Sequence, residues 1–314
     1  MDREPSLRPT LRQLQYFVAV AKYSAFGPAA NALAVSQPSL SKQLAAMEEE
    51  LGAILFERTS RSVKLTAIGE KLLPKARTIL QEAREFRAVA RGSSGLFGDR
   101  LAFGVLPSIG AYFMPAANRL LHSRYPDLRL VVQEGSTMNL LSMLKDGQLD
   151  VVVGTPTKNP EFFSKTLFAE TLWACTASDD AFSQCQDPIT IAELKDKPLL
   201  SLSPDFRLAE IVERIADAAS TYVNRDYQGA TLDAVRQMAV MGAGVAILPS
   251  LYALAEAIRD PEFIVRRIDH PQAKHEIALI WRRSSPISDD CLELAKHLMT
   301  VKRKIRAARP DKFR

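Results

Sequence analysis

The first apolar pattern along the chain has helical spacing. Between residues 10 and 23, apolar side chains recur at steps of three and four, which predicts a helix with one buried face. The Gly27-Pro28 pair indicates a break and a second helix start, because proline is tolerated in a first helical turn. Ala29, Ala30 and Leu33 then predict a short helix whose small side chains allow another helix to approach closely.

A third helix is predicted directly after a turn at Val35-Ser36. Ser36 suits the N-cap, Pro38 suits the first turn, and Gly52 suits the residue that ends the helix. The apolar positions predict an inward face made of Leu40, Leu44 and Met47. The polar side chains of the first turns then point outward, and they are Gln37, Ser39, Ser41 and Lys42.

Two short strands, 54–57 and 63–65, are predicted around an exposed basic tip at 58–62. This order of elements is the arrangement that places one helix in the DNA major groove: a helix, a turn, a second helix and a basic wing. The alternative is a helix pair that only packs, and it leaves the cap, the small helix and the basic wing unexplained. The sequence therefore predicts a winged helix-turn-helix DNA-binding domain over residues 1–66.

Residues 67–91 predict one long helix with Thr66 as its N-cap and Pro74 kinking or relaxing its early turns. Its apolar positions alternate four and three residues apart, and they are Leu72, Ala76, Ile79, Ala83, Phe86 and Ala90. Such a heptad seam predicts a partner helix, and a pairing with its own copy makes a twofold DNA reader. A helix packed only on its own domain is the alternative interpretation.

Residues 92–98 are rich in Gly and Ser and predict a hinge. Apolar runs at 101–106, 128–133 and 150–154 then alternate with helices from about Ile109 and Thr137. A second series follows at 198–202, 205–219, 222–228, 232–241 and 245–248. This alternation predicts a mostly parallel sheet in two lobes joined by crossing segments. The first lobe is expected to contain residues 99–171 and 268–301, and the second lobe residues 172–267. Ligands in such folds bind outside the carboxyl ends of the strands.

The charge is distributed unevenly along the 314 residues. Residues 1–91 hold 14 Lys and Arg against 9 Asp and Glu, whereas residues 92–301 hold 20 against 26. A cationic N-terminal block favours phosphate contacts, so DNA binding is expected there. The last segment, 302–314, holds 7 against 1, and it predicts either a solvated helix end or an auxiliary DNA contact.

Several other chemistries find little support. Cys175, Cys185 and Cys291 lack paired spacing and the four histidines are dispersed, so no metal or other cofactor is expected. The phosphate-binding and nucleophile motifs of common enzymes are missing, which argues against an enzyme on a doubly wound fold. No membrane-length apolar run and no signal-peptide pattern occur, so a cytoplasmic protein is expected rather than a secreted solute-binding protein.

The run from Leu11 to Pro74 closely resembles the winged helix-turn-helix of LysR-type transcriptional regulators, and QMAVMGAGVAILP resembles a segment of their second effector lobe. The resemblance implies an α/β protein: a DNA-binding domain, a linker helix and a two-lobed, Rossmann-like effector domain of the periplasmic-binding-protein type. It also implies promoter DNA, a small-molecule inducer and RNA polymerase as partners; a small anionic metabolite is the inducer expected from the helix starts described below. Dimers through the linker helices and tetramers through the effector domains are implied as well.

The resemblance also assigns residue roles. It places Ser36, Gln37, Pro38, Ser39, Ser41 and Lys42 at the major groove, with Arg58, Thr59 and Arg61 at flanking phosphates or the minor groove. In the effector cleft it implies Ser108, Ile109, Gly110, Thr155, Pro156, Ser203, Phe206, Arg207 and Thr231. Ser108 and Thr231 stand where helices begin, so free N–H groups there attract anions, although plain helix capping is an alternative role.

The family's peroxide-sensing members carry a reactive cysteine near the position of Arg207 and a second one a few residues on. This chain has neither. Cys175 lies in an apolar, strand-like segment, where an inert packed thiol is expected, and a disulfide between Cys175 and Cys185 stays possible. A thiol-responsive regulator is therefore the alternative to a metabolite-responsive one.

Overall fold

The computed structural model describes residues 9–58, 63–90, 100–177, 187–226, 231–260, 263–285 and 287–308. The chain divides into two compact units, one mainly from residues up to Ser94 and one mainly from Gly95 onward. Each unit is considered by itself. The predicted hinge at 92–98 lies outside the described residues, as do Thr59 and Arg61 at the wing tip and Cys185.

The N-terminal unit has the predicted three-helix start. Thr10 and Gln13 form a reciprocal capping box, and Ser36 Oγ accepts the Ser39 N–H at 3.4 Å. Gly52 closes the third helix at a φ of 60°, where a side chain is strained. The helices are α1 (Leu11–Tyr23), α2 (Phe26–Ala32) and α3 (Gln37–Leu51).

The wing is an antiparallel pair, β1 (Phe56–Arg58) and β2 (Val63–Leu65). The first strand begins two residues later than predicted. Glu48 of α3 lies beside this strand, and its Oε1 accepts the N–H groups of Leu55 at 2.8 Å and Phe56 at 3.2 Å. The Leu55 carbonyl accepts the Thr66 N–H at 3.0 Å, so the two chains stay bonded before the ladder begins at Phe56.

Helix α4 (Ala67–Ala90) begins as predicted, since Thr66 Oγ1 accepts the Gly69 N–H at 3.0 Å. Ala76 is buried in the core that Phe17, Leu44 and Phe56 form, and Leu72 packs against the same core. Ala76 is therefore covered by its own chain, whereas Leu72 is only partly buried, and the pairing of this seam with a second copy stays a prediction. Farther along α4 the apolar side chains of the seam are exposed to solvent, by 47% for Ile79 and 76% for Phe86.

The first lobe of the C-terminal unit contains the predicted parallel strands. β3 (Arg100–Val105) pairs in parallel with β4 (Arg129–Glu134) and with β5 (Val151–Gly154). The helices between them are α5 (Pro107–Tyr112), α6 (Met114–Arg124) and α7 (Thr137–Lys145). Pro107 starts α5 two residues before the predicted Ile109, because proline suits a first turn.

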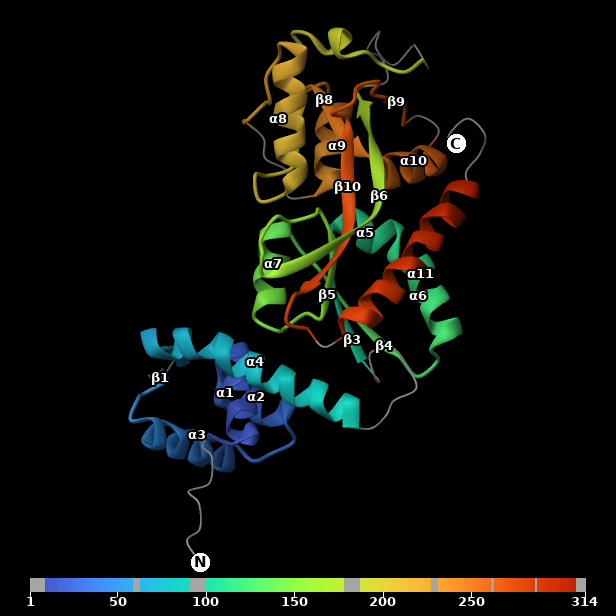
Figure 1. Ribbon diagram of the computed structural model, residues 1–314. Coiled ribbons are helices and arrows are strands. Elements are labelled where there is room, and N and C mark those ends of the chain that lie inside the picture. Colours follow the sequence, from blue (N-terminus) through green and yellow to red (C-terminus); the bar gives the residue numbers. More distant parts are fainter. Residues whose placement is uncertain are drawn as a thin grey trace, which may run out of the picture. The chain divides into compact units, whose positions relative to one another are not determined.

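Two long strands cross between the lobes side by side (Figure 1). β6 (Phe162–Cys175) pairs antiparallel with β10 (Lys274–Arg282) along its first part and with β8 (Val245–Pro249) and β9 (Val265–Arg267) at its end. β10 also pairs antiparallel with β5. The sheet is therefore mixed, with parallel pairs inside each lobe and antiparallel pairs wherever a crossing strand takes part.

The second lobe places β7 (Leu199–Leu200) parallel to β8. Around them lie a 3₁₀ turn (Ile191–Leu194), α8 (Arg207–Ala219), α9 (Leu232–Val240) and α10 (Ser250–Arg259). The strand predicted at 222–228 is wrong: within the described part only Val223 bridges Leu199. Asn224 Oδ1 then accepts the Asp226 N–H at 3.0 Å and turns the chain away.

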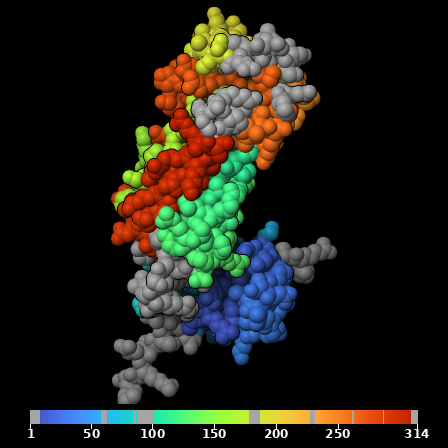
Figure 2. Space-filling model, turned by 90° about the vertical axis from the view of Figure 1, so that its right-hand side faces the viewer, coloured from blue at the N-terminus to red at the C-terminus, as the bar shows by residue number. Residues whose placement is uncertain are grey.

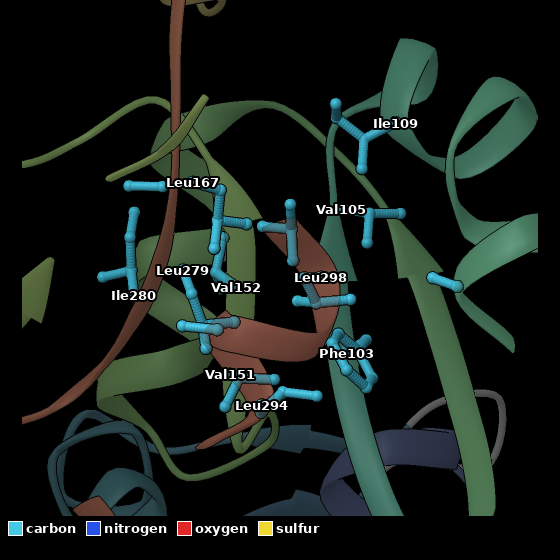
Figure 3. Close-up of a cluster of buried hydrophobic side chains, with 14 of the residues drawn as sticks. Phe103, Val105, Ile109, Val151, Val152, Leu167, Leu279, Ile280, Leu294 and Leu298 are labelled. Atoms are coloured by element: carbon cyan, nitrogen blue, oxygen red, sulfur yellow. The ribbon is translucent and has the colours of Figure 1, made fainter. Parts of the chain in front are cut away.

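Each lobe has its own buried apolar cluster. In the first, side chains from the strands point toward Leu294 and Leu298 of α11 (Ser288–Ala307), as Figure 3 shows. Figure 2 shows α11 along the surface beside α6. Ile268 and Ala273 belong to the second cluster, so the chain returns to the first lobe later than the predicted residue 268. The segment predicted as a basic tail continues α11 to Ala307.

Candidate functional site

A pocket lies between the two lobes of the C-terminal unit. The first lobe supplies residues that follow β3, β4 and β5. The second lobe supplies residues at the ends of β7 and β8 and at the starts of α8 and α9, and β10 supplies one residue. The lining residues are Leu106, Pro107, Ser108, Thr137, Thr155, Leu202, Phe206, Arg207, Leu208, Thr231, Leu232, Pro249 and His275. The pocket thus combines an apolar surface with several hydroxyl groups.

Five of the nine predicted cleft residues line this pocket: Ser108, Thr155, Phe206, Arg207 and Thr231. The other four do not. Ile109 is fully buried in the first lobe's core, and Gly110 offers no side chain, since a Cβ there would meet the Glu134 carboxylate. Pro156 and Ser203 stand beside lining residues without lining the pocket themselves, and the Ser203 carbonyl accepts the Phe206 N–H at 3.1 Å in a turn.

Thr137 is a lining residue that sequence reasoning missed. It is the first residue of α7 and is 5% exposed. Its Oγ1 has no hydrogen-bond partner within the described residues. A buried hydroxyl without a partner is costly, so a ligand group that bonds it gains affinity. The predicted helix start at Thr137 was the signal that could have identified it, by the argument applied to Ser108 and Thr231.

His275 is another lining residue that was missed. Its Nε2 lies 2.8 Å from Thr155 Oγ1, and its Nδ1 lies 4.0 Å from Glu170 Oε2. Burial lowers the pKa of His275 to about 4, so the ring is neutral at pH 7. Glu170 is fully buried, and its Oε1 accepts the Leu251 N–H at 2.8 Å. No sequence signal marked His275, because β10 itself was not predicted.

The pocket's electrostatics come mainly from helix starts and hydroxyls. Arg207 is the cationic lining residue, and its Nη1 lies 2.6 Å from Glu210 Oε1 on a half-exposed surface. Much of its charge is therefore already paired. Thr231 Oγ1 accepts the Ala234 N–H at 3.2 Å and caps α9, which leaves its hydroxyl hydrogen available.

The predicted DNA-contacting residues of α3 share one exposed stretch. Ser36, Gln37, Pro38, Ser39 and Lys42 are exposed, and Ser41 is half-buried. Leu40, Leu44 and Met47 are buried on the other side, as predicted. Arg58 ends β1, and its side chain lies outside the described part, as Thr59 and Arg61 do entirely.

The described cysteines are free thiols buried inside the protein. Cys175 is fully buried, and burial raises the pKa of its thiol to about 12. Cys291 is buried in the first lobe's core. Among the described residues no group of three or more His, Cys, Asp or Glu side chains is arranged to hold a metal ion. No helix in the described ranges is both long and apolar enough to cross a membrane.

The low pKa of His275 makes a prediction about stability. Its folded pKa of about 4 lies below the value of about 6.5 in an unfolded chain, so the unfolded state takes up the proton first as pH falls. The stability contribution is present above pH ~6.5 and is lost as pH falls toward ~4. Between pH 7 and pH 5, the free energy of unfolding of His275→Gln should therefore fall by about 2 kcal/mol less than that of the parent protein.

Urea unfolding at a series of pH values measures this difference. The matched control is His122→Gln, in which an exposed histidine of α6 is replaced in the same way. Parallel profiles for His275→Gln and the parent would contradict the prediction.

Comparison with known proteins agrees with this geometry. Residues 11–70 match the family model for the bacterial regulatory helix-turn-helix protein of the lysR family, and residues 94–302 match the LysR substrate binding domain. A hydrogen peroxide-inducible genes activator of Dickeya chrysanthemi is 32% identical over 286 residues, which cover 91% of this chain and 93% of the relative.

Two solved structures are also similar. A full-length OxyR from Pseudomonas aeruginosa, solved with one cysteine replaced by aspartate, has a TM-score of 0.76 at 29% identity, covering 93% of this chain and 95% of the other. An H2O2-bound Corynebacterium glutamicum OxyR, solved with one cysteine replaced by serine, has a TM-score of 0.64 at 32% identity, covering 96% and 97%. With a winged helix-turn-helix, a two-lobed effector domain and matches to both family models, the chain belongs to the LysR family of DNA-binding transcriptional regulators.

Proposed function

We propose that this regulator reads promoter DNA as a dimer and that a small anionic metabolite in the inter-lobe pocket controls its DNA binding and bending. The observation that carries the ligand part is the buried Thr137 hydroxyl, which lines the pocket without a partner among the described residues. By family membership, a homotetramer, a contact with RNA polymerase and a cytoplasmic location belong to the same proposal. Regulation rather than catalysis is the proposed activity.

The exposed first turns of α3 support the assignment of DNA contacts. Short polar side chains and one cation leave the helix surface at Gln37, Ser39 and Lys42, where base edges and phosphates are within reach. The wing follows at Arg58. Base contacts select sequence, whereas phosphate contacts bind all sequences alike.

This division predicts different results for two substitutions. Gln37→Ala should lose about 1–3 kcal/mol on the operator and little on random DNA, because a base contact is removed. Arg58→Ala should weaken both and reduce the salt slope by roughly 1, because a phosphate contact is removed. Fluorescence anisotropy on both DNAs at several salt concentrations measures this, with the exposed Gln43→Ala as control. Equal losses on both DNAs for both variants would refute the division.

The exposed part of α4 supports the dimer. Ile79 and Phe86 keep apolar surface in solvent seven positions apart, the spacing of a coiled-coil seam, and Ala83 stands between them on the same seam. Leu72 and Ala76 complete the seam in sequence, but Ala76 is buried within the chain and Leu72 is partly buried against the same core. The proposed interface is therefore the later half of α4.

Phe86→Ser should raise the dimer dissociation constant at least roughly tenfold, because a buried aromatic contact is worth more than about 1.4 kcal/mol. The control is Glu82→Ser on the same helix, where an exposed carboxylate is removed. Analytical ultracentrifugation reads the assembly state, and circular dichroism checks the helix. Unchanged dimerisation of a folded Phe86→Ser protein would exclude this seam.

The helix starts around the pocket support an anionic ligand. Thr137 begins α7 and Thr231 caps α9, so N–H groups and hydroxyls converge from both lobes. Such a surface favours a carboxylate even though Arg207 is already paired with Glu210. A ligand that bonds both lobes stabilises a closed arrangement, and this arrangement would alter the spacing of the DNA-binding domains.

Thermal-shift screening against small carboxylates tests the ligand, since a bound ligand raises the melting temperature by mass action. Thr137→Val should weaken binding about tenfold, whereas Thr300→Val, a matched change on α11 away from the pocket, should not. DNase footprints and DNA-bending assays with the hit then test control. Identical footprints and bending with and without it would refute the mechanism.

A thiol switch is the alternative that the peroxide-responsive relatives raise. The two similar OxyR structures were both solved with a cysteine replaced. Residues 201–210 of this chain surround the position expected for a reactive cysteine and contain none, and Phe206 and Arg207 line the pocket there. Cys175 is buried with its pKa raised, which removes the thiolate that peroxide chemistry needs. We therefore favour a metabolite over a peroxide signal.

A further inference from the structure

A buried polar chain runs from the pocket to the start of α10. Thr155 lines the pocket, His275 Nε2 lies 2.8 Å from its hydroxyl, and Glu170 lies on the other side of the ring. His275 and Glu170 are direct partners in the register of β10 and β6. Both are almost wholly buried, so water does not compete for their hydrogen bonds.

Glu170 accepts hydrogen bonds from the start of α10, whereas its contact with the ring is electrostatic and too long for a hydrogen bond. Its Oε1 accepts the Leu251 N–H at 2.8 Å and the Ser250 hydroxyl at 3.4 Å, at the start of the ten-residue helix α10. A carboxylate is stabilised at a helix N-terminus by these donors and by the helix dipole. Its second oxygen, Oε2, lies 4.0 Å from His275 Nδ1.

This environment decides which ring nitrogen carries the hydrogen. A neutral imidazole has one N–H and one lone pair. A lone pair on Nδ1 would face the carboxylate and repel it, whereas an Nδ1–H is attracted to it. With the hydrogen on Nδ1, the Nε2 lone pair must accept the hydrogen of the Thr155 hydroxyl, its neighbour at 2.8 Å.

We propose that Glu170 fixes His275 as the Nδ1–H tautomer and thereby makes Thr155 a hydrogen-bond acceptor toward the pocket. This inference deepens the proposed function and depends on it for the ligand. An effector then needs an O–H or N–H group at Thr155, in addition to the anionic group near Thr137. Its apolar part lies on Leu202, Leu208 and Leu232. The expected class is a small carboxylate that carries a hydroxyl or amine group.

The tautomer is tested directly, without any ligand. ¹⁵N-histidine labelling and NMR at pH 7 identify the protonated nitrogen, and the His275 signals are assigned by their loss in His275→Gln. We expect a neutral ring with hydrogen on Nδ1. A neutral ring with hydrogen on Nε2, or an imidazolium at pH 7, overturns the proposal.

Glu170→Gln gives a second, opposite expectation. The amide oxygen stays with the Leu251 N–H, so the amide NH₂ group faces Nδ1 and donates to it. The ring should then carry its hydrogen on Nε2 and accept nothing from Thr155. A ring unchanged from the parent shows that Glu170 does not fix the tautomer and overturns the proposal.

Ligand preference is tested with paired probes that differ by one hydroxyl: butyrate and 3-hydroxybutyrate, benzoate and 3-hydroxybenzoate, phenylacetate and mandelate. Calorimetry on the full chain should show at least one pair in which the hydroxylated member binds about five- to tenfold more tightly. Thr155→Val should abolish that preference and Thr155→Ser should retain it. Melting temperatures confirm that each variant is folded.

The outcomes separate this inference from the function on which it rests. If carboxylates bind and ignore the hydroxyl, the acceptor role of Thr155 is overturned and the anionic effector survives. If no probe binds the parent while its melting temperature is normal, both the anionic effector and the ligand class inferred here are overturned. A preference that persists in folded Thr155→Val also overturns the role of Thr155.

Discussion

The antiparallel pairing of β6 with β10 is the constraint on which the rest of the C-terminal unit depends. The two strands join both lobes, and their register sets Glu170 opposite His275. The pocket needs that register, because His275 is its contribution from the crossing strands. A slip of one residue would turn His275 out of the interior and break the chain of contacts from Thr155 to α10. The backbone ladder therefore fixes the chemistry of the pocket wall.

The polar groups of the pocket divide into two kinds. Thr137 and Thr231 stand at helix starts and present donors, so they suit negative charge. Thr155 is set apart from them, because its hydroxyl already has a partner in His275. The ring is neutral since burial lowers its pKa. With the proposed tautomer of His275, a pocket that offers both donors and an acceptor discriminates among ligands of the same net charge.

Local signals predicted most of the N-terminal unit. The caps at Ser36 and Thr66, and the glycine at Gly52, act within one helical turn, so the sequence alone reveals them. The crossing strands were not predicted in detail, because their pairing joins residues far apart in the chain. His275 shows the limit: its meaning depends on Thr155, which lies 120 positions earlier. Ile109 was assigned to the cleft by its place after β3, whereas its side chain faces the first lobe's core.

Under the proposed dimer, helix α4 serves two interfaces in succession along its length. Its early turns, with Ala76, complete the core of the DNA-binding domain, and its later turns present Phe86 to solvent. Substitutions in the two halves should therefore have separable phenotypes, with folding defects from one and assembly defects from the other. Paralogues that share this division can diverge in their dimerisation partner while their DNA-binding domains stay unchanged. A single helix then lets partner choice and operator choice evolve independently.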